Sequence, residues 1–440
     1  MHFLKRFNRY SALFLSLSSL FFFSCSVQKQ IAKQAKKSIL TDSNFLPAHV
    51  GIALFDVSKQ QYVYSYQSNK YFVPASNTKL LTCYAAMKYL GDSLVGLKYI
   101  NDEGEYTIKF TGDPTLLHPD FKQQPVYDFF KKNHDNITVI PADWKAEKYG
   151  MGWAWNDYDA DYMPERSAMP VFGNTVRFNK KGNAVIAMPK AFQDSLLLLA
   201  DTRQNKFSIT RNQFTNDFTV KAANTTFKGT EIPFVTSFDM GIALLQDSLH
   251  NDITAVDAEV KSTTSWKKLY SQPTDSLLKI MMHRSDNFFA EQTLLMVSNE
   301  QLGYMSDSKI IDTLLKTDYA AMPQKPRWVD GSGLSRYDLV TPQDFVFVLN
   351  KMKQDFNWNR ITGILPTGNE GTLAGLYKNY AGKIYAKTGT LSGVVALSGF
   401  IITNKGKQYI FSLMVNAHQT AASNIRKGFE KFLSGVIEKY

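Results

Sequence analysis

The stretch Pro74-Ala75-Ser76-Asn77-Thr78-Lys79-Leu80-Leu81 decides how the rest of this 440-residue sequence is read. Apolar residues at helical spacing follow it as far as Gly91, so we expect a helix to begin here. Ser76 and Lys79 would then share one helix face. A serine hydroxyl is a weak nucleophile, and a lysine whose pKa is lowered by burial or by a second cation can serve as its base. An N-cap serine beside a solvated lysine would give the same pattern, so the stretch alone does not establish catalysis.

Two later stretches favour the catalytic interpretation. Ser285-Asp286-Asn287 lies between two segments of helical periodicity, and Lys387-Thr388-Gly389-Thr390 lies in an extended segment. The order Ser-x-x-Lys, Ser-Asp-Asn, Lys-Thr-Gly is typical of penicillin-binding proteins and class A β-lactamases. We expect Ser285 and Asn287 to face a cleft, while Asp286 turns away to cap the following helix. A polar capping turn without a catalytic role is the alternative interpretation of this tripeptide.

The remaining sequence predicts one discontinuous domain with an insert. Strand patterns at 50–55 and 62–66 precede the Ser76 helix, and two more at 399–403 and 408–415 precede a final amphipathic helix. Between residues 98 and 234, short strand-like runs alternate with turn residues, which indicates a mostly β insert. We therefore expect an α/β protein of the α+β type, with an antiparallel sheet flanked by helices. The expected segments are a signal peptide at 1–24, catalytic parts at 25–97 and 235–440, and the insert at 98–234.

The first residues predict export. Lys5, Arg6 and Arg9 precede an apolar run from Ala12 to Phe23, which is typical of a secretory signal peptide. The run ends at Cys25 after a small residue, as at a bacterial lipoprotein cleavage site. We therefore expect lipidation of Cys25 and a periplasmic, membrane-anchored protein. Cleavage by ordinary signal peptidase near the same place is the alternative.

The charge of the sequence limits its partners. A net charge of +11 suits anionic partners such as lipid headgroups or carboxylate-bearing wall peptides. The lysines at 29, 33, 36 and 37 predict a solvated tether or a membrane-facing patch. No zinc-finger pattern or RNA-binding aromatic motif occurs, so we expect no nucleic-acid partner. The histidines show no metal-ligand spacing, and we expect neither a metal nor another cofactor.

The motifs together resemble those of the class C low-molecular-mass penicillin-binding proteins, which are D-alanyl-D-alanine carboxypeptidases and endopeptidases. The similarity extends, in the family's order, to 112–116, 152–157, 285–291, 330–336, 371–373 and 386–391. Residues 162–168 depart from the family's usual Tyr-Gly-Ala-Pro-Val-Ser-Ala run. The resemblance implies a penicillin-binding, β-lactamase-like transpeptidase domain that acts on peptidoglycan stem peptides and is acylated by β-lactam antibiotics.

The resemblance also implies roles for the three motifs. Ser76 would attack the carbonyl between two D-alanines and form an acyl-enzyme, while Lys79 would accept the serine proton. Ser285, held by Asn287, would relay a proton towards the leaving amine. Lys387 would stay charged, help to keep Lys79 neutral and attract the terminal carboxylate of the substrate.

The strand that carries Lys387 would bind the rest of the substrate. The Thr388 and Thr390 hydroxyls would hold the terminal carboxylate, and Gly389 would let the strand approach the substrate closely. The backbone N–H groups of Ser76 and Thr390 would form the oxyanion hole.

Two other functions fit parts of this pattern. A serine β-lactamase shares the motifs, but the large insert argues against class C, and no clear deacylating glutamate motif supports class A. A non-catalytic, penicillin-sensing, wall-binding lipoprotein would have no need of intact Ser76, Lys79, Ser285 and Lys387. Turnover of a D-Ala-D-Ala peptide separates these alternatives.

Overall fold

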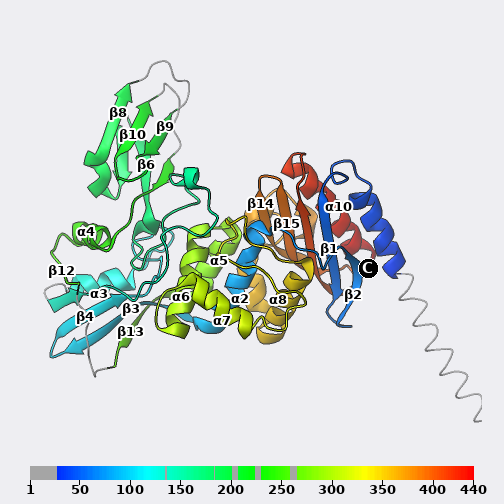
Figure 1. Ribbon diagram of the computed structural model, residues 1–440, viewed down its shortest axis with the longest axis horizontal. Helices are drawn as coiled ribbons and strands as arrows, with labels where there is room; N and C mark the ends of the chain where they lie inside the picture. Colours follow the sequence, from blue (N-terminus) through cyan, green and yellow to red (C-terminus); the bar gives the residue numbers. More distant parts are fainter. Residues whose placement is uncertain (1–26, 134–135, 183, 201–206, 223–228, 258–264) are drawn as a thin grey trace, which may run out of the picture.

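The computed structural model describes residues 27–133, 136–182, 184–200, 207–222, 229–257 and 265–440. The expected signal peptide and Cys25 lie outside these residues. Figure 1 shows an elongated molecule, with a mixed sheet-and-helix region at one end and a β-rich region at the other. Within the described ranges, no helix combines the length and the apolar character that crossing a bilayer requires.

A five-stranded antiparallel sheet in the order β14-β15-β16-β1-β2 forms the centre of the sheet-and-helix region. Strand β1 pairs with β16 along its whole length, from His49 opposite Asn416 to Asp56 opposite Tyr409. The two ends of the chain therefore meet in one sheet, as the predicted discontinuous domain requires. The strands are β1 His49–Asp56, β2 Gln61–Tyr66, β14 Ile384–Leu391, β15 Val394–Ile402 and β16 Gln408–Asn416.

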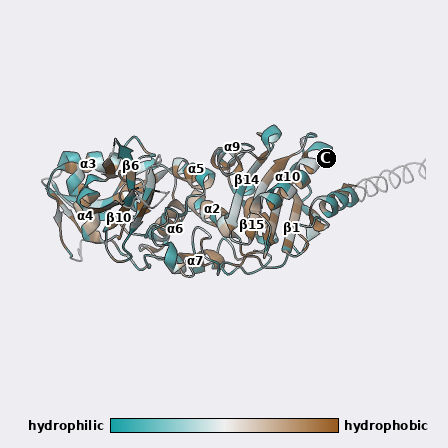
Figure 2. Cartoon of the chain, turned by 90° about the horizontal axis from the view of Figure 1, so that it is seen from above, coloured by the Kyte–Doolittle hydropathy of each residue, from teal (hydrophilic) through white to brown (hydrophobic). Residues whose placement is uncertain are grey.

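Helices cover both faces of this sheet, and its central strands are coloured as hydrophobic in Figure 2. On one face lie α10 (Ala422–Lys439) and a helical segment at 27–40, the last part of which is the π-helix Lys36–Leu40. Ile31, Ala35 and Ile39 of that segment are completely buried, whereas its four lysines are exposed. The expectation of a solvated tether is wrong for these residues, because apolar side chains at four-residue spacing form a stripe that docks on the fold.

The other face carries the helices that position the motifs. Helices α2 and α6 are buried on nearly all sides, although they carry polar residues such as Lys79 and Glu291. A polar side chain in such a position has to find a partner inside the protein. The helices are α2 Lys79–Tyr89, α5 Thr274–Arg284, α6 Asn287–Leu302, α7 Asp307–Lys316, α8 Pro342–Asp355 and α9 Trp358–Ile364.

The β-rich region contains three sheets among the described residues, ordered β12-β5-β4-β3-β13, β11-β6-β7 and β8-β10-β9. Their strands are β3 Ser93–Asp102, β4 Glu105–Phe110, β5 Ile137–Val139, β6 Thr175–Lys181, β7 Ala184–Met188, β8 Leu196–Ala200, β9 Ser208–Arg211, β10 Phe218–Ala222, β11 Thr230–Pro233, β12 Thr254–Ala255 and β13 Lys267–Pro273. Helices α3 Pro125–Asn133 and α4 Phe238–Leu249 belong to the same region.

The contacts of α4 and β13 join both elements to the β-rich region. Ile242 and Leu245 of α4 pack in the apolar cluster of the β-rich region. Strand β13 pairs with β3, with Pro273 opposite Ser93. The helical periodicity after residue 234 predicted α4 correctly but could not say which sheet it covers. We therefore propose that the insert spans residues 93–273, and that the catalytic region comprises the chain on either side.

Candidate active site

Ser76 lies in a strained turn that leads into a helix. The 3-10 turn η2 spans Ala75–Thr78, and the α-helix begins at Lys79. Ala75 has a φ of +48°. Residues other than glycine rarely adopt such a conformation, and it is found where the surrounding structure holds a functional residue in place. The half-buried Ser76 lines a cavity of about 530 Å³.

Lys79 is completely buried and has three polar contacts. Its Nζ lies 3.1 Å from Ser76 Oγ, 2.6 Å from Asn287 Oδ1 and 2.8 Å from the carbonyl oxygen of Ser332. The Asn287 Oδ1 and Ser332 carbonyl oxygens can only accept hydrogen bonds. A neutral amine that donates to both therefore directs its lone pair at the Ser76 hydroxyl.

The surroundings of Lys79 favour its neutral form. Burial lowers the pKa of Lys79 to about 8, although Asp330, Asp286 and Glu291 oppose this shift by favouring the ammonium. A pKa near the working pH suits a general base, because a substantial fraction of the amine is then free of its proton.

The Ser285-Asp286-Asn287 turn joins α5 to α6. Ser285 ends α5 in a left-handed conformation, and Asp286 caps α6 by accepting a hydrogen bond from the backbone N–H of Phe289. Asn287 points into the cleft, where its Nδ2 donates to the carbonyl of Tyr162 in the insert at 3.0 Å. The turn has the alternation that the sequence predicted, with the capping side chain facing away from the cleft.

Lys387 is as deeply buried as Lys79 but has different partners. Its Nζ donates to Ser285 Oγ at 2.8 Å and to the carbonyl of Thr388 at 2.7 Å. Burial, and then the neighbouring Lys79, hold the pKa of Lys387 well below its usual value. This environment disfavours a positive charge on Lys387, and the expected charged state stays a prediction. Its two contacts are neutral oxygens, whereas three carboxylates support the charged form of Lys79.

Gly389 is needed for packing between β14 and the Ser76 turn. A Cβ at this position would lie 2.6 Å from the carbonyl oxygen of Pro74. No larger residue fits without moving the Ser76 turn, because backbone atoms cannot give way as a flexible side chain does. The expected role of Gly389 in substrate approach stays a prediction.

The two threonines on β14 lie close to α10. Thr388 contributes to a small cavity that is also lined by Arg426 and Phe429 of α10. Arg426 donates through a guanidinium N–H to Thr390 Oγ1 at 2.7 Å, and Thr390 also lines the cavity that contains Ser76. Arg426 was not predicted from the sequence, where α10 showed only an apolar stripe.

The 530 Å³ cavity lies between the catalytic region and the insert. The insert supplies Gly152, Ala154, Asp157 and Tyr162 to its wall, and the catalytic region supplies the rest. The remaining lining residues are Ser76, Ser285, Asn287, Gly333, Leu334, Arg336, Thr390, Leu391 and Ser392. Within the described ranges, no group of three or more His, Cys, Asp or Glu is arranged to hold a metal ion.

The chain is similar to known proteins in sequence and in fold. The sequence matches the family described as D-Ala-D-Ala carboxypeptidase 3 (S13) over residues 32–436. The D-alanyl-D-alanine carboxypeptidase DacB of Haemophilus influenzae is 23% identical, over 89% of this chain and 92% of its own length. A D-alanyl-D-alanine carboxypeptidase of an Actinomadura species is 24% identical, over 88% of this chain and 81% of its own length.

The fold has a counterpart among solved structures. The crystal structure of penicillin binding protein 4 from H. influenzae has a TM-score of 0.72 at 20% identity, and the match covers 93% of this chain and 99% of that one. The predicted fold class, an antiparallel sheet flanked by helices with a β-rich insert, is confirmed. The predicted family and enzyme class are confirmed as well. The chain belongs to the D-Ala-D-Ala carboxypeptidase (S13) family of serine-type carboxypeptidases.

Proposed function

We propose that this protein cleaves the D-Ala-D-Ala end or the cross-link of peptidoglycan stem peptides through an acyl-enzyme on Ser76. The observation that carries the proposal is the completely buried Lys79, whose Nζ lies 3.1 Å from Ser76 Oγ and is held by two acceptors. Ser76 Oγ attacks the scissile carbonyl carbon and passes its proton to Lys79 Nζ. The backbone N–H groups of Ser76 and Thr390 stabilise the oxyanion that forms.

Ser285 and Lys387 serve the leaving group. The C–N bond breaks as the leaving amine takes a proton through Ser285 Oγ, which Lys387 holds at 2.8 Å. The carboxylate of the leaving D-alanine binds near Lys387 and the hydroxyls of Thr388 and Thr390. Because a nearby negative charge favours the ammonium form, binding of this carboxylate raises the lowered pKa of Lys387. Water then attacks the acyl-enzyme and releases the shortened peptide.

The same site suits β-lactam antibiotics. The lactam carbonyl and carboxylate would take the places of the scissile carbonyl and the terminal carboxylate. Penicillin binding protein 4 of H. influenzae, which shares this fold, has been solved in complex with a β-lactam, and this supports the proposal. Asp157 of the insert lines the cavity wall, and we propose that it contacts the stem-peptide side chain.

Product analysis on purified peptidoglycan fragments tests the proposal. Wild-type protein should release D-alanine or cleave cross-links, whereas Ser76→Ala should do neither. Intact-mass analysis with penicillin should show one adduct, which peptide mapping places on Ser76. An adduct on another serine contradicts the assignment. Rapid turnover of penicillin without peptide cleavage would favour the β-lactamase alternative. A penicillin adduct that forms without turnover of penicillin and without peptide cleavage would favour a sensor.

We also propose that the protein is exported and anchored to the membrane through a lipidated Cys25. The basic start, the apolar run and the cysteine support this, and so do the exposed lysines of the helical segment at 27–40. Mass spectrometry of the mature N-terminus is the test. An unmodified Cys25, or a mature chain that starts beyond it, contradicts anchoring.

A further inference from the structure

The carbonyl of Ser332 is one of the two acceptors that hold Lys79. The loop at residues 330–335, which carries Ser332, therefore controls the direction of the Lys79 amine. Within this loop, Asp330 Oδ1 accepts from the backbone N–H of Gly333, and Asp330 Oδ2 accepts from that of Ser335, both at 2.7 Å. The loop also packs against the Ser76 turn, because a Cβ on Gly333 would lie 1.9 Å from the carbonyl oxygen of Ala75.

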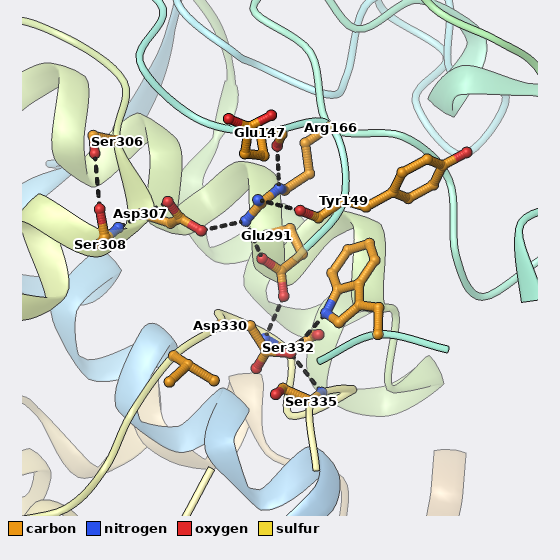
Figure 3. Close-up of polar contacts among 12 residues, drawn as sticks. Glu147, Tyr149, Arg166, Glu291, Ser306, Asp307, Ser308, Asp330, Ser332 and Ser335 are labelled. Atoms are coloured by element: carbon orange, nitrogen blue, oxygen red, sulfur yellow. Dashed lines mark hydrogen bonds and ion pairs between the residues drawn. The ribbon is translucent and has the colours of Figure 1, made fainter. Parts of the chain in front are cut away.

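The insert reaches this loop through a buried arginine. Arg166 is 1% exposed, and its guanidinium lies 3.2 Å from Glu291 Oε2 and 2.6 Å from Asp307 Oδ2 (Figure 3). Glu291 Oε1 in turn accepts from the backbone N–H of Ser332 at 2.8 Å. A continuous path therefore runs from the insert through one carboxylate to the residue whose carbonyl holds Lys79.

Arg166 is itself held in a fixed orientation by the insert. Its Nε donates to the carbonyl of Glu147 at 3.0 Å, and a terminal N–H donates to that of Tyr149 at 3.1 Å (Figure 3). These contacts use the rigid fork of the guanidinium, which a lysine could not reproduce. The position of the carboxylate of Glu291 is thus tied to the backbone of the insert.

A second bond joins the insert to the same loop. Trp153 Nε1 donates to Asp330 Oδ2 at 2.9 Å, and the Arg166 guanidinium lies 5.5 Å from the Trp153 ring centroid. Since Asp330 organises the loop backbone, this bond fixes the loop from a second direction.

The charges around Glu291 make its position depend on Arg166. Burial and the nearby Asp330 raise the pKa of Glu291 to about 7, while Arg166 favours the ionised form. Without Arg166, Glu291 would be a buried carboxylate beside other acids, and such a group takes up a proton or moves towards water. Either change disturbs its bond to the Ser332 N–H.

We propose that Arg166, assisted by Trp153, is a positioning residue through which the insert aligns the general base for acyl transfer. Arg166 holds Glu291, Glu291 holds Ser332, and the Ser332 carbonyl directs Lys79 at Ser76. The proposal rests on the assignment of Lys79 as the base. It gives the insert a part in the acylation step in addition to its contribution to the cleft wall.

The test compares Arg166→Met with Arg211→Met in the full mature chain. Arg211 is a matched control, because it is also a buried arginine of the insert, at 2% exposure, but it donates to insert carbonyls instead of reaching the catalytic loop. Penicillin acylation is followed over a range of concentrations, which separates the maximal rate from the apparent affinity. Arg166→Met should lower the maximal rate about 30- to 100-fold with affinity nearly unchanged, whereas Arg211→Met should change either value less than about 3-fold.

Two further variants keep the test decisive if Arg166→Met does not fold. Arg166→Met combined with Glu291→Gln removes the unpaired carboxylate, and it should fold but remain slow because no arginine holds the side chain at position 291 against the Ser332 N–H. Trp153→Phe removes one hydrogen bond from a half-buried ring, and it should lower the maximal rate about 3- to 10-fold.

Rates at the level of Arg211→Met in the folded Arg166 variant and in Trp153→Phe would overturn the proposal. If the wild-type protein itself is not acylated on Ser76, the proposed function fails instead.

Discussion

Asn287 Oδ1 lies 2.6 Å from Lys79 Nζ, and this bond joins two helices whose residues are 208 positions apart in the sequence. Asn287 is in turn fixed by its donation to the carbonyl of Tyr162. Lys79, the proposed general base at the start of α2, is therefore oriented by Asn287 at the start of α6 and, through Tyr162, by the insert.

Asn287→Asp should raise the pKa of Lys79 and slow acylation at neutral pH. The new carboxylate would face the amine directly, and an opposite charge at this distance favours the ammonium by about 1 to 3 pKa units. Acylation at pH 7 should fall about 10-fold or more and recover partly towards pH 9, because Lys79 then loses its proton. The measurement is the acylation rate constant between pH 6 and 10. An unchanged acid limb would show that Asn287 does not face the titrating base.

Lys79→Arg should abolish acylation without preventing folding. A guanidinium keeps its proton in proteins, so it cannot accept the proton of Ser76. Loss of a general base lowers the rate by about 10² to 10⁴-fold. Acylation by penicillin, with circular dichroism as the folding control, measures the effect. A folded variant that reacts at close to the wild-type rate would remove Lys79 from the mechanism.

Lys387→Met should impair carboxylate-bearing substrates selectively. The carboxylate of the peptide would lose its cation, and we expect a fall in kcat/KM of about 30-fold or more for a D-Ala-D-Ala peptide. An uncharged ester should lose less activity than the peptide, because it brings no carboxylate to the site and is affected only through the bond from Lys387 to Ser285. Lys387→Arg keeps the charge but changes its shape, so its effect on the peptide should be smaller than that of Lys387→Met. Equal losses on both substrates would contradict the role in carboxylate binding.

Gly389→Ala should destabilise the protein and slow acylation together. The new methyl group would press on the carbonyl oxygen of Pro74, and overpacking of this kind costs about 1 to 3 kcal/mol. Gly363→Ala is the control, because the Cβ that it would add in α9 meets no atom within 4 Å outside the backbone of its own helix and its chain neighbours. Thermal melting and acylation rates of the two variants give the comparison. A normal rate in Gly389→Ala would mean that β14 and the Ser76 turn have room to move.

The stability of the wild-type protein relative to Lys79→Met should rise with pH. The folded protein binds the Lys79 proton more weakly than the unfolded chain, because burial lowers the pKa from 10.5 to about 8. The unfolded chain therefore holds more protons between these values. Stability rises as the pH increases from about 8 to 10.5, and this gain is lost as the pH falls back to about 8. The expected gain is on the order of 3 kcal/mol. Urea unfolding of both variants at pH 7, 9 and 10.5 measures the trend, and a constant difference would contradict the buried-base assignment.

The sequence by itself determined the family, the fold class and the three motifs. Ser76-x-x-Lys79 at helical spacing, a capping aspartate in Ser285-Asp286-Asn287 and the strand alternation around Lys387 are local patterns. Such patterns follow from backbone geometry and residue type, so they are visible without any tertiary contact. The same local rules predicted strands β1, β2, β15 and β16 of the central sheet and the apolar face of α10.

Tertiary structure alone decided how these groups act on one another. The lowered pKa of Lys387 depends on burial beside Lys79, which no local pattern reveals. The acceptor from Ser332 is a backbone carbonyl, and every residue carries one, so its sequence position has no chemical signature. Arg166 acts across 125 residues on Glu291, and only the packing of the insert on the catalytic helices brings the two together. Periodicity shows which residues are buried, whereas partners distant in the chain are chosen by the way the elements pack.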